Sequence, residues 1–546
     1  MAHTRDSKPR AASGLSSAFA LAVLLLAVYL QTFGGVFHSI DEEVYLHLTA
    51  SLAERASFSV EPVSYWPDFG VAEGVDGRLY ANRGPGLALA ALPFYWLGVG
   101  LAEAEGTAGL VPSSSIDVPT TVTLSLTLLN CLTVTALDVL LYLALLRLGY
   151  SARVAVSVAL LFGLGTLAWP YASKSFFGEP LLALCCLLSF YCLLIYRQRG
   201  GRRWLLLGGL ALGWAVLTKV TAFLLIPFLL AYALWPTIGR GTLAWELPVS
   251  RRSGQDGPRE RSLLGARPAL PGGGFAASRY HLRRGLATTA AWFVAGLLPF
   301  VAFWLAHNHV RFGNPLVTGY ELEGGGIGLA ADSLGRVVMG LGNLIGSSGK
   351  GVLWYAPPVV LGVVAARRFW RSHPAEAVCL YGSALATLVG VCIWRDWSGG
   401  WCWGPRLLLN VVPFLVLPSA EMLSCWNDSP RRTRWVIPAV AAISVAVQLV
   451  GVLPNYLQWY MLAEGGDLVY FDPSYSPIAG HLWLLQNGQV DLFWDKVELF
   501  FPQRVAVFSW VRWMLAAAAA AASVVLWRLS AEHAEGVAAP SSDGPA

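Results

Sequence analysis

The strongest candidate for chemistry is a group of three carboxylates that follows the first apolar stretch of the chain. Asp41, Glu42 and Glu43 lie in the segment His-Ser-Ile-Asp-Glu-Glu-Val-Tyr, which ends at Tyr45. Carboxylates at a membrane boundary are costly to desolvate, and they are well placed to take a proton from an incoming hydroxyl group. A structural role is the alternative, because Ser39 and Glu42 have the spacing of a capping box and acids favour the first turn of a helix.

A second candidate is the glycine-rich segment 77–86, Gly-Arg-Leu-Tyr-Ala-Asn-Arg-Gly-Pro-Gly. It contains Arg83 and leads into an apolar stretch with the composition of a helix. A cation beside a helix N-terminus favours phosphate binding, because the free N–H groups and the helix dipole both attract an anion. The alternative is an ordinary turn whose arginine lies among lipid headgroups.

The elements that must position these residues are membrane helices. The 546-residue chain is 55% hydrophobic and only 13% charged, whereas a soluble domain carries about a quarter charged residues. Its mean hydropathy is +0.55, and its longest apolar runs, with their flanks, reach the ~20 residues of a membrane crossing. This excludes a soluble enzyme, a disulfide-stapled secreted module and a disordered chain, and it predicts an all-α polytopic membrane protein. The eight cysteines lack metal-binding spacing and are predicted to be core residues.

Basic clusters predict the topology. Seven clusters hold 25 of the 38 Lys and Arg residues, and the positive-inside rule assigns such clusters to the cytoplasmic side. The first apolar stretch is predicted to be an uncleaved span, because no small-residue cleavage site precedes the acidic group. Twelve spans with both termini inside satisfy the rule, at 15–34, 119–146, 154–172, 179–196, 204–218, 220–235, 286–306, 351–366, 376–394, 407–424, 435–454 and 505–527.

The apolar segment 86–101 does not fit this count, since a crossing there would move every later basic cluster outside. It is therefore predicted to lie at the membrane interface, which makes residues 35–118 one long outer loop with 11 Asp and Glu against 3 Lys and Arg. Basic, Gly- and Pro-rich linkers and Ala/Ser/Pro-rich tails are typically flexible. The predicted organisation is a cytoplasmic tail (1–14), a membrane core (15–425) that contains the outer loop and a flexible cytoplasmic linker (236–285), C-terminal helices (426–528) with an outer loop at 455–503, and a disordered cytoplasmic tail (529–546).

Further motifs follow in order along the chain: Thr218-Lys219 beside a short span, Arg311-Phe-Gly-Asn-Pro-Leu-Val-Thr-Gly-Tyr320, Gly349-Lys-Gly-Val-Leu-Trp-Tyr-Ala-Pro357 and Trp397-Ser-Gly-Gly-Trp-Cys-Trp-Gly-Pro-Arg406. With the acidic pair and the segment around Arg83, this order resembles the integral-membrane glycosyltransferases of the GT-C class. The similar branch, of the glycosyltransferase family 39 type, includes protein O-mannosyltransferases and the aminoarabinose transferase of lipid A. The resemblance covers most of residues 15–425 and implies a GT-C fold with about twelve transmembrane helices and a long first outer loop carrying juxtamembrane helices.

The resemblance implies a glycosyltransferase that takes a sugar from a polyprenyl-phosphate donor at the outer face of the cell's inner (plasma) membrane, with inversion at the sugar. Asp41 inherits the role of general base, and Glu42 would hold Asp41 or the acceptor. Glu179 occupies the family's second acidic position, where many relatives carry Asp. An inverting transfer through an oxocarbenium-like state needs a base on the face opposite the leaving group. No cofactor, metal or nucleic acid is expected, and the acceptor (a glycan, lipid or protein) stays open.

The departing lipid phosphate gains negative charge, so preplaced cations stabilise it more in the transition state than before. Lys219 lies between two short spans, where snorkelling or pairing with a carboxylate is the alternative. Arg311 and Arg406 each border a predicted span, and for these two residues anchoring among lipid headgroups is the alternative. Lys174 and Glu179 lie close enough in sequence to neutralise each other. The candidates for binding the donor phosphate are Arg83, Lys219, Arg311 and Arg406.

Aromatic residues of the same motifs are candidates for binding the substrate. One aromatic cluster consists of Trp394, Trp397, Trp401 and Trp403. Such a cluster could stack on a sugar, but anchoring in the membrane interface is the favoured interpretation. Relatives often carry Lys-Pro-Pro where this chain has Arg83-Gly-Pro, which keeps the cation and loosens the start of the helix. The candidates for substrate binding are Tyr45, Tyr80, Tyr320, Trp401 and Trp403.

Two other classes of function are weighed against this hypothesis. The chain has no nucleotide-binding glycine fingerprint, Walker motif, HExxH motif or nucleophile elbow, which argues against a nucleotide-sugar donor and an ATP-driven pump. A lipid or solute transporter or flippase would place charges mid-span in two related halves, but only Asp138 and Lys219 lie deep in apolar sequence. A non-catalytic assembly subunit is disfavoured by the intact acidic pair and Arg83, although residues 456–503 match no pattern and leave it open.

Overall fold

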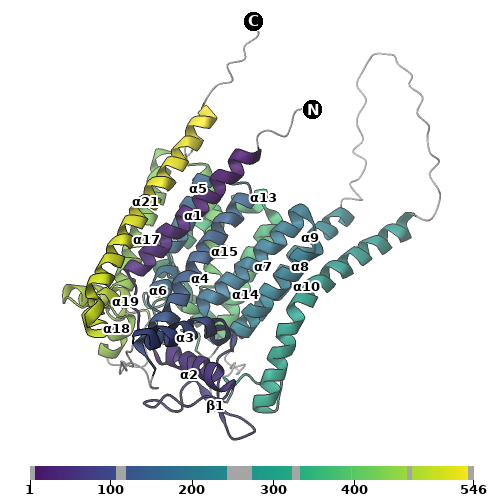
Figure 1. Ribbon diagram of the computed structural model, residues 1–546. Helices are drawn as coiled ribbons and strands as arrows, with labels where there is room; N and C mark the ends of the chain where they lie inside the picture. Colours follow the sequence, from purple (N-terminus) through teal and green to yellow (C-terminus); the bar gives the residue numbers. More distant parts are fainter. Residues whose placement is uncertain are drawn as a thin grey trace, which may run out of the picture.

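Helices dominate the computed structural model, which describes residues 7–105, 118–242, 274–322, 333–394, 396–426, 428, 430–463 and 470–538. The longer helices run side by side as a bundle (Figure 1). They are α1 (Ser7–Gln31), α4 (Thr120–Arg147), α5 (Ala152–Gly165), α7 (Glu179–Arg199), α8 (Arg202–Thr218), α9 (Ile226–Thr242), α10 (Gly274–Phe312), α13 (Pro358–Ser372), α14 (Pro374–Ile393), α17 (Arg431–Val452) and α21 (Val505–Ala538).

Eight helices of the described residues are long and apolar enough to cross a membrane. The chain is therefore a helical polytopic membrane protein, as predicted, whereas the number of twelve spans stays a prediction. Several predicted spans are broken helices. Residues 154–172 divide into α5 and α6 (Ala168–Ser173), and 220–235 begins with the 3-10 helix η1 (Val220–Leu225). Two further spans divide at prolines, because proline cannot continue a helical hydrogen-bond ladder. Residues 351–366 divide into α12 (Val352–Tyr355) and α13. Residues 407–424 divide into η3 (Arg406–Leu408), α15 (Val412–Val416), η4 (Leu417–Ser419) and α16 (Ala420–Ser424).

The two ends of the bundle differ. α1 begins and α21 ends at the upper end in Figure 1, and the two helices pack side by side. At the lower end lie α2 (Ile40–Arg55), α3 (Gly86–Glu105) and an antiparallel hairpin of β1 (Val71–Glu73) and β2 (Leu79–Ala81). The segment predicted as a single outer loop is thus gathered at one end, apart from residues 106–117, which lie outside the described residues.

α3 lies across the lower end of the bundle rather than along it (Figure 1). Its length and composition would suffice for a membrane crossing, so hydropathy alone does not distinguish the two arrangements. It packs on α2 and α4, and the approach to α4 is close: a Cβ on Gly98 would lie 2.4 Å from the Cα of Val122. This arrangement supports the interfacial helix that the charge pattern predicts.

The C-terminal part returns to the lower end before the last helix. α21 continues past Arg528 to Ala538, where the sequence predicted a disordered tail; alanine and glutamate in this stretch favour a helix. Residues 539–546, and residues 243–273 of the predicted linker, lie outside the described residues. The remaining elements are α11 (Ser333–Gly346), α18 (Tyr456–Leu462), η5 (Pro473–Tyr475), α19 (Pro477–Gln486), η6 (Phe493–Asp495), α20 (Val497–Phe500) and η7 (Pro502–Arg504).

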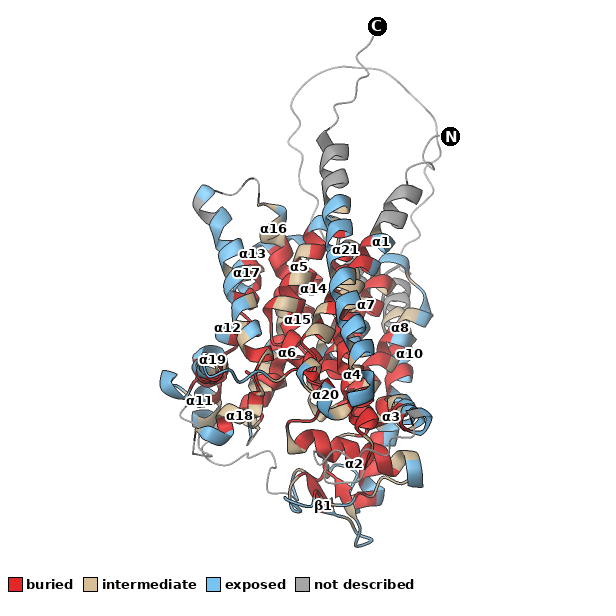
Figure 2. Ribbon diagram, turned by 60° about the vertical axis from the view of Figure 1, so that its left-hand side comes forward, coloured by how far each residue is buried: buried red, intermediate tan, exposed pale blue. Residues whose placement is uncertain are grey.

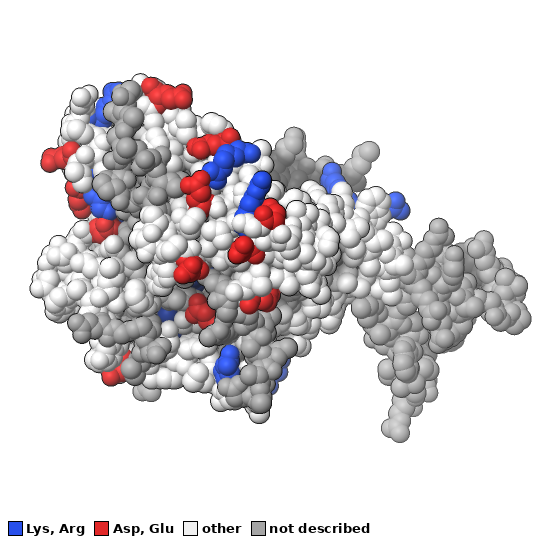
Figure 3. Space-filling model, turned by 90° about the horizontal axis from the view of Figure 1, so that it is seen from below, with Lys and Arg blue, Asp and Glu red and all other residues white. Residues whose placement is uncertain are grey.

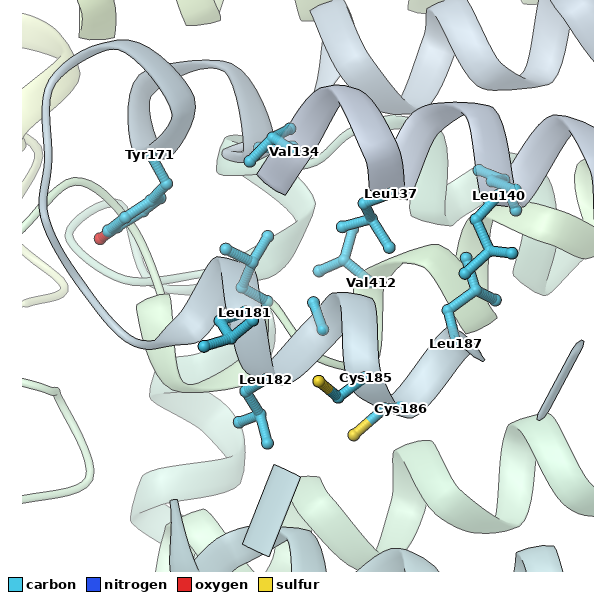
Figure 4. Packing of buried hydrophobic residues seen from close by; sticks show 14 of the residues in the cluster. Val134, Leu137, Leu140, Tyr171, Leu181, Leu182, Cys185, Cys186, Leu187 and Val412 are labelled. Atoms are coloured by element: carbon cyan, nitrogen blue, oxygen red, sulfur yellow. The ribbon is translucent and has the colours of Figure 1, made fainter. Parts of the chain in front are cut away.

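Apolar side chains fill the interior of the bundle (Figure 2). Figure 4 shows part of this packing, where Val134 and Leu137 of α4 lie near Leu181 and Cys185 of α7 and Val412 of α15. None of the eight cysteines, all of which lie in the described residues, forms a disulfide, and seven are buried. The prediction that they are core residues is confirmed for these seven, whereas Cys425 is half-buried.

Candidate functional site

Asp41 lies in the first turn of α2, where the neighbouring Glu42 fixes the helix start. The buried Glu42 carboxylate accepts hydrogen bonds from the backbone N–H groups of His38 (2.6 Å), Ser39 (2.8 Å) and Phe176 (2.6 Å). These bonds cap the helix and attach it to the loop before α7. The oxygens of Glu42 are engaged by backbone, and its predicted role of holding Asp41 or the acceptor stays a prediction.

Both carboxylate oxygens of Asp41 contact arginines from distant parts of the chain. Arg83 contacts Oδ1 through Nη2 and through Nε at 3.0 Å, and Nη2 of Arg406 donates to Oδ2 at 2.6 Å. Burial raises the pKa of Asp41, but the two guanidinium groups lower it more, so the pKa lies well below its usual range. A carboxylate held in this way is a weak base until an arginine is drawn off.

Glu179 and Lys219 form the second ion pair of the site. Glu179 begins α7, Lys219 follows α8, and Nζ of Lys219 lies 2.6 Å from Oε1 of Glu179. Nε of Arg406 lies 3.7 Å from the same oxygen, which joins this pair to the first one. The predicted neutralisation of Glu179 by Lys174 is wrong, because Lys174 pairs with Asp491 at 3.3 Å.

Two glycines bring Arg83 close to the end of α8. A Cβ on Gly86 would lie 2.5 Å from Oγ1 of Thr218, and a Cβ on Gly84 would lie 2.2 Å from the carbonyl oxygen of Leu217. Gly84 lies at the position where the resemblance implies a proline in many relatives. Its effect is to permit this close packing, whereas the sequence suggested only a looser helix start.

Arg311, near the C-terminal end of α10, connects this helix to the hairpin. Its Nη1 donates to the carbonyl oxygen of Ala81 (2.7 Å), and its Nη2 donates to Oδ1 of Asn308 (2.8 Å). Val75 returns a bond from its N–H to the carbonyl oxygen of Arg311 (2.8 Å). The guanidinium group is thus oriented by neutral acceptors and keeps its charge for another partner.

These charged side chains line one pocket at the lower end of the bundle, between α2, α8, α10 and α14. Its lining contains four Lys and Arg residues and three Asp and Glu residues, so positive charge is in excess. Eight of the twelve predicted site residues line it: Asp41, Tyr45, Arg83, Glu179, Lys219, Arg311, Tyr320 and Arg406. The sequence prediction that they lie together is met, and their individual roles stay predictions.

Three aromatic candidates lie outside this pocket. The hydroxyl of Tyr80 donates to Oδ2 of Asp76 (2.8 Å) on the hairpin. Trp401 stacks on Tyr460 at the surface, with ring centroids 6.3 Å apart, and Trp403 is buried in the core. None of these three rings lines the pocket. The sequence could not reveal this, because residue type and spacing do not fix the direction in which a side chain points.

The pocket also contains residues that the sequence did not assign to it. Asn82 accepts a hydrogen bond from Nη1 of Arg83 (2.8 Å). Trp394 packs edge to face on Tyr320, with centroids 5.1 Å apart, and the guanidinium of Arg83 lies over the same tyrosine ring. Asp396 adds a carboxylate to the lining. Position in the sequence was the available signal, since Asn82 belongs to the quoted segment 77–86 and Trp394 and Asp396 lie within three positions of the motif that begins at Trp397.

The face of the molecule at this end carries charges of both signs, with many acidic side chains (Figure 3). Within the described part of the chain, no group of three or more His, Cys, Asp and Glu side chains is arranged to hold a metal ion. The groups that the pocket offers to an anionic ligand are its arginines and its lysine.

The apolar bundle and the buried cluster of cations and carboxylates define an integral-membrane protein with a pocket suited to an anionic substrate. Residues 89–249 match the family model described as dolichyl-phosphate-mannose-protein mannosyltransferase. The match confirms the predicted resemblance to GT-C glycosyltransferases and the predicted enzyme class. It includes Glu179 and Lys219, whereas Asp41, Arg83 and Arg406 lie outside it.

No curated protein matches the chain. Among solved structures, ArnT from Cupriavidus metallidurans bound to undecaprenyl phosphate is 15% identical, with 94% of this chain and 75% of that chain covered and a TM-score of 0.47. The Archaeoglobus fulgidus oligosaccharyltransferase in the apo form is 13% identical over 91% of this chain and 59% of that chain, with a TM-score of 0.43. AglB from the same organism, in complex with an inhibitory peptide and a dolichol-phosphate, is 13% identical over 84% and 56%, also with a TM-score of 0.43. Similarity at this level carries no argument about substrate.

Proposed function

We propose that this protein transfers a sugar from a polyprenyl-phosphate donor to an acceptor at the outer face of the membrane, with inversion and with Asp41 as the general base. The observation that carries the proposal is the convergence of Asp41 with four cations in one pocket. These cations come from four separate segments of the chain, around residues 83, 219, 311 and 406. The four cations exceed the three carboxylates of the pocket lining, so positive charge is left for an anionic ligand.

The chemistry of the transfer uses both signs of charge. The acceptor oxygen forms a bond to the anomeric carbon while the bond from that carbon to the phosphate oxygen breaks, and the acceptor proton passes to a carboxylate oxygen of Asp41. The sugar passes through an oxocarbenium-like state. The leaving polyprenyl phosphate takes the bonding electron pair, and the cations stabilise the charge that develops on it.

The arginine contacts of Asp41 suggest the order of events. An incoming phosphate competes with Asp41 for Arg83 and Arg406, because guanidinium groups bind phosphate and carboxylate with the same geometry. Once an arginine turns to the phosphate, an oxygen of Asp41 is released and its pKa rises toward the usual range. The donor thus both fills the pocket and activates the base, so donor binding precedes proton transfer.

The donor class and the side of the membrane have separate support. The matched family is described by its dolichyl-phosphate-mannose donor, and an excess of positive charge suits a phosphodiester of this kind. α2, which carries Asp41 of the pocket, lies at the end of the bundle opposite to the start of α1 and the end of α21 (Figure 1). The positive-inside rule favours the cytoplasmic side for those two helix ends, which supports an outer position for the pocket.

The test is turnover of radiolabelled polyprenyl-phosphate sugars by the purified protein and by Asp41→Asn. Glu43→Gln is the matched control, because Glu43 lies on the same helix turn, contacts Tyr65 (3.0 Å) and does not line the pocket. The proposal expects turnover by wild type and by the control, and its loss in Asp41→Asn. Undiminished turnover in Asp41→Asn would remove the proposed base, and failure of every lipid donor together with solute flux in vesicles would favour a transporter.

A further inference from the structure

A buried lysine outside the pocket holds the loop that leads to Arg406. Lys350 lies between α11 and α12 in the Gly-Lys-Gly motif, and its side chain has no measurable exposure. Its Nζ donates to the carbonyl oxygens of Gly400 (2.7 Å) and Cys402 (2.9 Å) and approaches that of Gly404 (3.4 Å). One ammonium group thus gathers three carbonyls of a single loop.

The other partners of this ammonium belong to the same region. Sγ of Cys402 lies 3.1 Å from Nζ, and the ring of Tyr460 lies under the charge, with its centroid 5.5 Å away. The Tyr460 hydroxyl donates to the Cys402 carbonyl oxygen (2.8 Å). Among the described residues, Lys350 is therefore compensated by carbonyl oxygens, a thiol and a ring. Burying an ammonium without a carboxylate is costly, so the loop and the lysine depend on each other.

The shape of the loop explains why its carbonyls need a cation. Gly399, Gly400 and Gly404 have positive φ angles of 71°, 72° and 63°, and these turns direct successive carbonyls inward. Carbonyl groups that face one another in a dry site repel and remain unsatisfied unless a donor lies between them. The ammonium of Lys350 supplies up to three donors at this point.

The loop contacts Arg406 directly. The site of a Cβ on Gly399 lies 3.0 Å from Cγ of Arg406 and 3.1 Å from its Nε. Only Pro405 separates Gly404 from Arg406, whose Nη2 then reaches Oδ2 of Asp41 at 2.6 Å. A shift of the loop by about 1 Å would break this contact, and misplacement on that scale can cost about 10²-fold in rate.

We propose that Lys350 is a positioning residue that fixes the loop 399–405. The fixed loop holds Arg406 where it can contact Asp41 first and the donor phosphate afterwards. Lys350 does not line the pocket and touches no reacting atom; it acts through Arg406. The inference rests on the proposed function and adds to it the residue that sets the phosphate-binding geometry.

A double-mutant cycle tests this dependence. The variants are Lys350→Met, Arg406→Gln and the double variant, and the measurements are the dissociation constant for undecaprenyl phosphate and the donor KM and kcat. Lys350→Met is expected to weaken lipid-phosphate binding and raise the donor KM about tenfold or more. In the Arg406→Gln background the same change is expected to add less than about threefold, because Arg406 is already lost.

Lys174→Met is the control for removing a buried lysine. Lys174 pairs with Asp491 and does not contact the loop 399–405, so its effect should multiply with that of Arg406→Gln. Thermal unfolding is recorded for every variant. If Lys350→Met does not fold, Lys350→Arg takes its place in the cycle, since it keeps the charge but displaces the carbonyl contacts.

The outcomes separate the two proposals. If wild type neither binds undecaprenyl phosphate nor uses a lipid-linked sugar, the proposed function fails. If wild type does both, an unchanged donor KM in Lys350→Met overturns the positioning role, and so does an effect that multiplies with that of Arg406→Gln.

Discussion

Two clusters of opposite charges lie at the lower end of the molecule, and one of them lines the pocket described above. In the pocket cluster, Asp41 and Glu179 are bridged by Arg406. In the anchor cluster, Asp491 lies between a histidine and two lysines: Nε2 of His38 at 2.7 Å and Nζ of Lys174 at 3.3 Å contact one oxygen, and Lys496 contacts the other. The members of the pocket cluster are Asp41, Arg83, Glu179, Lys219 and Arg406, and those of the anchor cluster are His38, Lys174, Asp491 and Lys496.

The clusters differ in whether their polar atoms without a hydrogen-bond partner belong to residues that line the pocket. Among the buried atoms without a hydrogen-bond partner in the described part of the protein, Oε2 of Glu179 and Nε of Arg406 belong to residues that line the pocket. In the anchor cluster, Nδ1 of His38 also lacks a partner among the described residues, but His38 does not line the pocket, and both oxygens of Asp491 are engaged. Burial raises the pKa of Asp491, but the neighbouring His38, Lys174 and Lys496 lower it below its usual range, as the arginines do for Asp41. A shifted carboxylate therefore does not identify a site by itself; a cavity with unused hydrogen-bonding capacity does.

The largest expected effect comes from neutralising the aspartate of the pocket cluster. Asp41→Asn should lose about 10²–10⁴ in kcat, the contribution of a general base. The same change should tighten the binding of undecaprenyl phosphate, because Arg83 and Arg406 lose their carboxylate partner. Equilibrium binding and turnover measured on one preparation check both halves, and weaker binding in Asp41→Asn would contradict the competition between Asp41 and phosphate.

Removing an arginine of the pocket cluster should act in the opposite direction on binding. Arg406→Gln should lower kcat by about 10²–10³, the usual cost of losing one preorganised donor to developing charge, and should weaken donor binding. Lys496→Gln is the matched loss of a cation from the anchor cluster. Steady-state kinetics of the two variants should differ, and equal losses would remove the distinction between the clusters.

Neutralising the aspartate of the anchor cluster should affect stability instead. Asp491→Asn leaves the buried Lys174 without its carboxylate, and breaking a buried pair in this way costs about 3 kcal/mol. The midpoint of thermal unfolding should fall, while kcat per folded molecule should stay near that of wild type. A kcat as low as that of Asp41→Asn would assign the anchor cluster a direct part in the reaction.

The smallest expected effect is a shift of the pH profile. In the free protein the arginines hold the pKa of Asp41 below its usual range, so the base is ionised and kcat/KM for the donor should show no acid limb near pH 4. Donor phosphate draws the arginines off and raises this pKa, so the acid limb of kcat should lie at higher pH than that of kcat/KM. Coincident limbs in the two profiles would contradict donor-triggered release.

The sequence predicts the pocket cluster far better than the anchor cluster. Asp41, Arg83 and Arg406 belong to motifs whose order resembles a known class, even though the matched family model covers only residues 89–249. His38 and Asp491 are 453 positions apart, and no local pattern marks the region after Tyr456. Contacts that depend on the path of a loop across a bundle leave no periodic signal in the sequence.

The helical class was predictable from composition, but the continuity of the spans was not. Hydropathy adds apolar residues over a window and does not register breaks such as those at Pro413 and Pro418. Tyr80 shows the same limit at the level of one side chain. It lies three positions before Arg83, yet its hydroxyl bonds to Asp76 instead of entering the pocket.

The hydrogen bonds that join η6 to the end of the first helix and the residues after it have a consequence for how the protein is made. The carbonyl oxygens of Leu30 and Phe33 accept hydrogen bonds from Nε1 of Trp494 (2.8 Å) and the N–H of Phe493 (2.7 Å), a few residues before Asp41. In the order in which a ribosome makes the chain, Trp494 comes 464 positions after Leu30. Asp41 is therefore synthesised long before these partners, so a nascent chain, or one truncated before residue 493, carries Asp41 without the contacts that hold the segment in front of it.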